Sequence, residues 1–209
     1  MRADLQVVAE LVPPGSEVLD LGCGDGRLLE HLMRERGCRG SGVEISDEGF
    51  HACLSRGVPV LQSDIDRGLD EFADGHFDVG ILSQTLHALH RPAFAVEEMM
   101  RVARMAILSF PNFGHWPLRF GLATRGRMPV SRVLPHTWYD TPNIHLCTMR
   151  DFEDLLLQRD LTVDRRVLLN ADGRPAPGWV ARRANLLAAA VVYRLTDSLS
   201  TSADRPPRA

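Results

Sequence analysis

The stretch Val18-Leu-Asp-Leu-Gly-Cys-Gly-Asp-Gly26 is an apolar run that breaks into three glycines spaced two residues apart. The apolar residues at its start predict a buried parallel strand. The three glycines then predict a tight turn, where the missing Cβ atoms let a ligand lie directly on the backbone. A helix with one apolar face begins at Arg27 and stops at Gly37. A strand, a glycine turn and a helix in this order predict the nucleotide-facing corner of a doubly wound α/β sheet.

The spacing of the glycines narrows the choice of ligand. A dinucleotide fingerprint needs a further glycine where this chain has Arg27. The loop instead resembles the D/E-x-G-x-G-x-G loop of class I S-adenosylmethionine (SAM)-dependent methyltransferases. SAM has no phosphates, but it offers an amino acid, a ribose with two hydroxyls, an adenine and a sulfonium cation. We therefore expect acidic residues in its site.

The next two predicted strands supply such residues. Residues 42–45 predict a strand ending near Glu44, whose two carboxylate oxygens can accept both ribose hydroxyls. Residues 58–64 predict a third strand that ends at Asp64, although a solvated strand-end carboxylate is the alternative interpretation of this residue. The resemblance places Asp20 near the methionine ammonium, and Asp64 with the Ile65 backbone near adenine. It implies a site for SAM or S-adenosylhomocysteine made of Asp20, Gly22, Cys23, Gly24, Gly26, Glu44, Ile45, Asp64, Ile65 and Ser83.

Composition limits the class of protein. The 209 residues are enough for one domain, expected over residues 1–196, that buries about 70% of its unfolded surface. The net charge of −3 argues against a nucleic-acid partner. The four cysteines form no C-x-x-C pair, so we expect neither a metal site nor a disulfide framework, and a cytoplasmic location. Residues 1–12 predict an amphipathic helix rather than a signal peptide, and the apolar run 186–193 is too short to span a membrane.

The remaining pattern predicts the rest of the sheet and its helices. The two final strands have no crossover helix between them, which indicates an antiparallel hairpin. We therefore expect a single Rossmann-like fold with a mostly parallel seven-stranded sheet and an antiparallel last strand. The polar, proline-rich residues 197–209 predict a disordered tail. Helices are expected at 47–56 (capped by Ser46), 92–102 and 151–158, and the later strands at 77–83, 106–110, 161–169 and 185–195.

Residues 111–148, after the fifth predicted strand, are too long for an ordinary connection. Trp116, Trp138 and Tyr139 favour an ordered segment, which we expect to cap the C-terminal edge of the sheet beside the SAM site. Between His115 and Tyr139 the chain has four arginines and no acid. Large aromatic residues and arginine are typical of protein interfaces, so one hypothesis is a docking surface. The competing hypothesis is that the three aromatic side chains pack inward as a lid over the pocket.

Several phrases of the chain resemble one family closely. They are VLDLGCGDG (18–26), SQTLHAL (83–89), FPNFGHW (110–116), GRMPVS (126–131) and LPHTWYDTPNIHLCT (134–148). Together they resemble the methionine biosynthesis protein MetW family over about residues 1–195. The resemblance implies a methyltransferase-like fold and a partner, the homoserine O-acyltransferase MetX. In that pairing MetX, an α/β-hydrolase-type enzyme, carries the acyl-transfer nucleophile and needs MetW for full activity.

No catalytic residue can be assigned from the sequence. His87 and His90 are candidate bases, with a histidine of the surface or the core as the alternative. The amine-methylating Asn-Pro-Pro-aromatic turn is absent after the fourth predicted strand, and His136, Asp140 and His145 lack the spacing of metal ligands. A G-x-S-x-G elbow is also absent, so acyl transfer is not assigned to this chain.

Three functions stay open. The first is an accessory subunit of MetX that keeps a SAM pocket, through which SAM could act as a feedback signal. The second is an active methyltransferase on a small molecule. The third is a scaffold with a vestigial pocket, against which the intact glycine and acidic positions argue.

Overall fold

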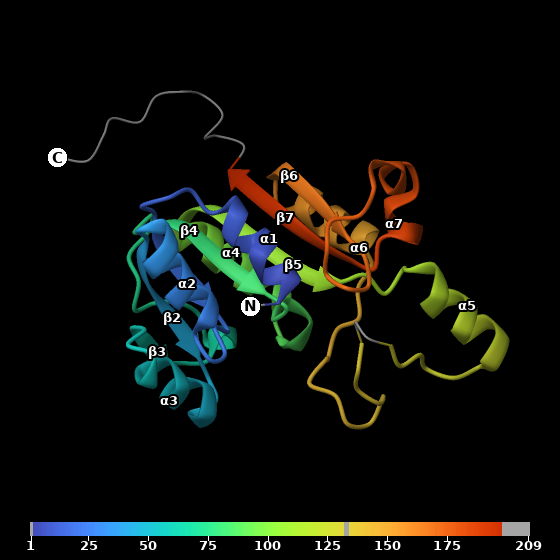
Figure 1. Cartoon of the computed structure of the whole chain (residues 1–209), viewed down its shortest axis with the longest axis horizontal. Coiled ribbons are helices and arrows are strands. Elements are labelled where there is room, and N and C mark those ends of the chain that lie inside the picture. Colours follow the sequence, from blue (N-terminus) through green and yellow to red (C-terminus); the bar gives the residue numbers. More distant parts are fainter. Residues whose placement is uncertain (1, 132–133, 198–209) are drawn as a thin grey trace.

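A seven-stranded sheet organises the chain in the order β3-β2-β1-β4-β5-β7-β6 (Figure 1). The structure is a computed structural model that describes residues 2–131 and 134–197. The pairs among β1 to β5 are parallel, whereas β7 lies antiparallel between β5 and β6. The strands are β1 (Glu17–Leu21), β2 (Arg39–Glu44), β3 (Val60–Gln62), β4 (Phe77–Ser83), β5 (Ala103–Pro111), β6 (Leu161–Leu169) and β7 (Ala190–Asp197).

Helices cover both faces of this sheet. Buried side chains of α1 and α2, with Cys53 of α3, pack on one face, and those of α4 and α6 pack on the other. The sequence sets the limits of α2, because Gly26 and Gly37 adopt left-handed conformations at its two ends. The helices are α1 (Ala3–Leu11), α2 (Arg27–Arg36), α3 (Asp47–Ser55), α4 (Pro92–Val102), α5 (Trp116–Arg125), α6 (Met149–Gln158) and α7 (Ala184–Leu187), with 3₁₀ turns η1 (Ile65–Arg67), η2 (Leu86–Ala88) and η3 (Gly178–Arg183).

The class I methyltransferase topology predicted from the sequence is confirmed. The bounds of β4, β6 and α4 coincide with the predicted ones. The expected Ser46 cap is present, because its hydroxyl accepts the Gly49 N–H. β3 is shorter than predicted and β5 is longer.

One predicted strand is wrong over its first five residues. Residues 184–187 form α7, and β7 begins only at Ala190. The run Leu186–Tyr193 is apolar throughout, and such a run suits a buried helix as well as a buried strand. Here the backbone carbonyls of Asn185 and Ala188 accept hydrogen bonds from the Asn112 side chain, a contact across 73 or more residues of sequence.

The insertion, residues 111–148, extends away from the sheet (Figure 1). It contains α5, which the sequence analysis did not predict, although Pro117 in the first turn and Gly126 at the C-cap are helix signals. Within the described residues, no helix is long and apolar enough to cross a membrane. The predicted disordered tail falls outside the described residues, apart from Asp197, which ends β7.

Candidate functional site

Glu44 connects the glycine loop to the start of α3. It ends β2, beside the end of β1, because Leu21 and Val43 are paired in register. Its Oε2 accepts the Gly24 N–H at 2.8 Å, and its Oε1 accepts the N–H and the hydroxyl of Ser46 at 3.0 and 2.8 Å. A carboxylate offers about four acceptor positions, so the protein itself uses most of those on Glu44.

The three loop glycines have different roles, although all have positive φ. A Cβ on Gly22 would lie 2.6 Å from the Thr85 side chain, and one on Gly26 would lie 2.9 Å from Cys53 Sγ. A Cβ on Gly24 would meet nothing within 4 Å. Gly22 and Gly26 thus allow close packing, whereas the Cβ position of Gly24 faces open space.

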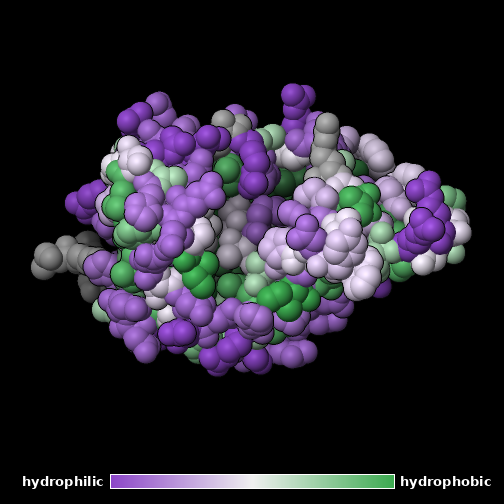
Figure 2. All heavy atoms as spheres, turned by 90° about the horizontal axis from the view of Figure 1, so that it is seen from below, coloured by the Kyte–Doolittle hydropathy of each residue, from purple (hydrophilic) through white to green (hydrophobic). Residues whose placement is uncertain are grey.

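A cavity of about 940 Å³ opens at the C-terminal ends of β1, β2 and β4. Seen from this side, the surface is hollowed between the two halves of the molecule (Figure 2). Five of the predicted site residues line this cavity: Gly22, Glu44, Ile45, Asp64 and Ile65.

The other predicted site residues lie near the cavity but do not line it. They are Asp20, Cys23, Gly24, Gly26 and Ser83. Cys23 Sγ lies 3.6 Å from Cys53 Sγ, and the Ser83 hydroxyl is hydrogen-bonded to that of Ser109 at 2.9 Å. Asp20 is almost fully buried. Whether these five residues contact a ligand stays a prediction.

Acidic side chains dominate the charge of the cavity wall. Its carboxylates come from Asp4, Glu44, Asp64, Asp66 and Asp172, while Arg2 is its one arginine among the described residues. Arg2 is itself paired with Asp4 at 3.2 Å. Behind this wall, burial and then the nearby Glu44 raise the pKa of Asp20 to about 7. The cavity therefore favours a ligand with positive charge.

Asp64 and Asp66 hold the backbone beside the cavity. Asp64 caps η1 by accepting the Asp66 N–H at 3.0 Å. The Asp66 carboxylate accepts the N–H groups of His90 and Arg91 at 2.9 and 2.7 Å. Asp64 thus has a structural role as well as a place on the cavity wall, and its contact with a ligand stays a prediction.

The residues that follow β4 form a further part of the cavity wall. The predicted site reached only to Ser83, at the edge of this part. Gln84 and Thr85 line the cavity, and Gln84 has a φ of 57°, which is uncommon for a residue other than glycine. His87 also lines it, and its Nδ1 is buried with no hydrogen-bond partner among the described residues. Burial lowers the pKa of His87 to about 4, so its imidazole is neutral at physiological pH. His90, the other candidate base, also lines the cavity but is exposed, beyond the end of η2.

A family model described as "Methionine biosynthesis protein MetW" matches residues 2–195. This chain belongs to the MetW family. A bifunctional methionine biosynthesis protein MetXA/MetW from Rhodopirellula baltica is 37% identical to it over 181 residues. The match covers 82% of this chain but 29% of that protein, so the chain spans less than a third of this relative's length.

Other relatives are methyltransferases. A ubiquinone biosynthesis O-methyltransferase from Hahella chejuensis is 29% identical over 158 residues, which cover 66% of each chain. Among solved structures, a SAM-dependent methyltransferase from Thermotoga maritima has a TM-score of 0.66 at 19% identity and covers 94% of this chain and 88% of its own. One from Archaeoglobus fulgidus has a TM-score of 0.66 at 17% identity, covering 93% and 92%. At these identities the structures establish the fold alone.

Two of the sequence phrases quoted above, residues 110–116 and 134–148, meet at the base of the insertion. Asn112 is fully buried, and its Nδ2 donates to the carbonyls of α7 described above. Its Oδ1 accepts the N–H groups of Gly114 at 2.9 Å and Met149 at 3.3 Å. The Phe113 N–H donates to the Cys147 carbonyl at 3.1 Å. One asparagine therefore fixes both ends of the insertion to the domain.

The insertion has an inner and an outer side in this MetW chain. On the inner side, Pro135, His136, Pro142 and Asn143 line the cavity. On the outer side, Trp116, Trp138 and Tyr139 are 51%, 74% and 74% exposed. The hypothesis that these aromatic side chains pack inward as a lid is therefore wrong. Within the described residues, no group of three His, Cys, Asp or Glu side chains could hold a metal ion.

Proposed function

We propose that this chain is an accessory subunit that supports or regulates the homoserine O-acyltransferase MetX in the cytoplasm. The observation that carries the proposal is the Rhodopirellula baltica relative, whose name joins MetXA and MetW in one protein. A covalent link keeps two units at a high effective concentration. Separate chains of the two kinds would need a non-covalent interface to stay together in the same way.

We further propose that the cavity binds SAM or S-adenosylhomocysteine. Its surplus of carboxylates suits the ammonium and sulfonium charges of SAM. Glu44 would accept a ribose hydroxyl with its remaining acceptor capacity, and a second hydroxyl would replace Ser46 on Oε1. Ile45, which is 64% exposed, would lie against the adenine, beside Asp64 and the Ile65 backbone.

Regulation follows from the position of SAM downstream of methionine. An occupied cavity would report that methionine is already abundant, so its occupancy would adjust the rate of MetX. The size of the cavity speaks against the vestigial scaffold, since a pocket that had lost its ligand would be free to fill with side chains.

A second candidate function is methyl transfer to a small molecule. The observation in its favour is that the cavity extends past the proposed SAM residues to Asn143 of the insertion and to the neutral His87, whose Nδ1 has no partner among the described residues. Incubation with SAM carrying a labelled methyl group and a metabolite extract tests it. Label in a small-molecule product would support this candidate, and label remaining in SAM would reject it.

Ligand binding is tested by calorimetry with S-adenosylhomocysteine. Hydrogen bonds to a charged group contribute about 1.5–3 kcal/mol each, so we expect Glu44→Ala to bind at least about tenfold more weakly. Glu48→Ala, an exposed acid on α3, is the matched control and should bind like the wild type. Ligand at 100 times its Kd should also stabilise the wild type by about 2.7 kcal/mol. No heat at millimolar ligand would reject a working site.

The accessory role is tested by the acyl-transfer rate of MetX, with and without this chain. We expect the rate to rise when the chain is present and to change again on addition of S-adenosylhomocysteine. The Glu44→Ala variant should keep the first effect and lose the second. An unchanged rate in the presence of the wild-type chain would reject the accessory role.

A further inference from the structure

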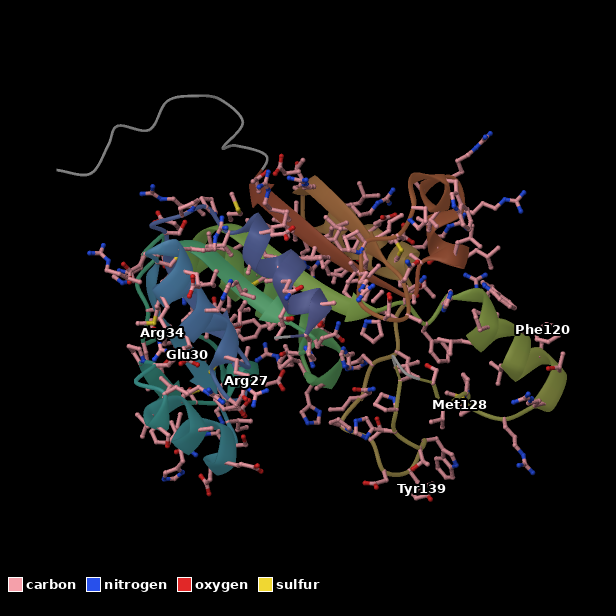
Figure 3. All side chains as sticks on the ribbon, in the orientation of Figure 1. Arg27, Glu30, Arg34, Phe120, Met128 and Tyr139 are labelled. Carbon is pink, nitrogen blue, oxygen red and sulfur yellow. The ribbon has the colours of Figure 1, made fainter. Side chains whose placement is uncertain are left out.

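The outer side of the insertion exposes more apolar surface than its own packing explains. Its exposed large apolar side chains include Trp116, Phe120, Met128, Val130, Trp138 and Tyr139. Phe120, Met128 and Tyr139 follow one another along this side, from α5 to the turn of the loop (Figure 3). An aromatic side chain has about 150–250 Å² to bury, so the four aromatic residues expose on the order of 500 Å². One partner in a stable complex contributes about 800 Å².

α5 itself lacks the contacts that usually stabilise a short helix. It has 10 residues, of which Leu118 is the buried one. An isolated helix shorter than about 12–15 residues is marginal in water, so α5 depends on packing against something else. Its N-terminal end is tied down, because the Arg119 guanidinium donates to the carbonyls of Gly114 and Asn185. Its remaining length is exposed.

Between His115 and Tyr139 the charged side chains of the described residues are all arginines, and the exposed Asp140 follows directly. Of the three arginines in the described part between His115 and Tyr139, Arg119 is engaged by those carbonyls, which leaves Arg125 and Arg127. Both are exposed, and among the described residues the structure records no acidic partner for either. By contrast, Arg27 and Arg34 of α2 are paired with Asp25 at 2.8 Å and Glu30 at 3.1 Å (Figure 3).

We propose that the outer side of the insertion is the surface that binds MetX, and that it contacts an apolar recess of MetX bordered by acidic side chains. This inference rests on the proposed accessory function and adds where the two proteins meet. Aromatic anchors surrounded by arginine are typical of the residues that dominate binding energy. The two unpaired guanidinium groups would find their carboxylates on the partner. Asn112 fixes both ends of the insertion, which limits the conformational entropy that its base loses on binding.

The first test uses charge reversal in the full chain. Arg125→Glu with Arg127→Glu should weaken MetX binding at least about 100-fold, because like charges would then face each other. Arg34→Glu with Arg39→Glu, which makes the same change of charge on α2 and β2, should bind MetX like the wild type. Affinity is measured as the binding of each variant to surface-immobilised MetX, at low and at physiological salt concentration. The unfolding midpoints of both variants should match that of the wild type, apart from the small loss of stability expected when surface ion pairs are broken.

A second variant tests the aromatic part independently of charge. Trp138→Ala with Tyr139→Ala should weaken binding at least about tenfold, whereas Leu54→Ala, an exposed apolar residue on α3, should not. Retained binding and full MetX stimulation by both insertion variants would overturn the docking site while leaving the accessory role intact. Failure of the wild-type chain to bind or stimulate MetX would overturn the accessory role itself. If the insertion variants lost self-association but kept MetX binding, the surface would belong to an interface with a second copy of this chain, and the proposal would be overturned.

Discussion

Asp20 and His87 are buried ionisable residues whose effects on stability oppose each other. Burial and Glu44 raise the pKa of Asp20 from 3.8 to about 7, so between these values the folded chain holds a proton that the unfolded chain has lost. The contribution of Asp20 to stability therefore falls as pH rises from 3.8 to about 7. Burial lowers the pKa of His87 from 6.5 to about 4, so there the unfolded chain holds the extra proton. Stability from His87 rises with pH, and the two effects cancel between about pH 4 and 6.5.

We expect single substitutions to reveal the pH dependence of stability that each of these two residues contributes. Relative to the wild type, Asp20→Asn should gain stability with rising pH between 4.5 and 6.5, by up to about 1.4 kcal/mol per pH unit. His87→Gln should lose stability with rising pH over the same range. Urea unfolding at several pH values and constant ionic strength measures both. Profiles that run parallel to the wild type would contradict the assigned burial of these groups.

At the scale of elements, Asn112 joins β5, the insertion, α6 and α7. Asn112→Ala leaves the N–H groups of Gly114 and Met149 and the carbonyls of Asn185 and Ala188 without this partner. Leaving a buried polar group unsatisfied costs about 1–3 kcal/mol, so we expect a loss of at least about 3 kcal/mol in urea unfolding. The exposed Asn170→Ala should change stability by less than about 0.5 kcal/mol.

The insertion gives a second readout for the same variant. Proteolysis of native Asn112→Ala should cut within residues 113–147 sooner than in the wild type, because the two ends of the insertion are no longer held together. Equal cutting times would mean that the remaining contacts suffice to hold the segment, namely the Phe113–Cys147 hydrogen bond, the hydrogen bonds of Ile144 and His145 to the His87 carbonyl, and buried Leu134.

Elements with local signals could be predicted well from the sequence. Pro92 marks the start of α4, and the apolar residues of 77–83 mark β4, which is buried over most of its length. The strand expected from residue 185 was wrong because an apolar run does not separate helix from strand, and a distant side chain decides between them. The half of the cavity around Glu44 could be predicted from the residues at the ends of the predicted strands. The half around His136 and Asn143 could not be predicted, since it depends on how the insertion folds back.

At the scale of the whole molecule, one segment serves both proposed sites. Residues 135–143 line the cavity with their inner side and expose Trp138 and Tyr139 on the other. The N–H groups of Ile144 and His145 donate to the His87 carbonyl at 2.8 and 2.9 Å, which ties this segment to the cavity wall. A ligand that shifts the inner side would therefore also shift the outer side.

We expect the two binding equilibria to be linked. If S-adenosylhomocysteine changes the MetX affinity by some factor, saturating MetX must change the S-adenosylhomocysteine affinity by the same factor. Calorimetry of each ligand with and without the other measures both factors. Coupling is typically worth about 1–3 kcal/mol, which corresponds to about 5–150-fold. A factor of one in both directions would show that the cavity and the partner do not communicate.

The place of β7 in the sheet sets an order of events during translation. β5 borders β7 and not β6, so its outer edge has no partner until residues 190–197 have left the ribosome. At about 5–20 residues per second, several seconds separate the synthesis of the two strands. During that interval α5 and its exposed aromatic residues are already made, beside an open strand edge. Nascent chains are thus most vulnerable to aggregation before β7 has emerged, when an early bound partner or a chaperone would protect them.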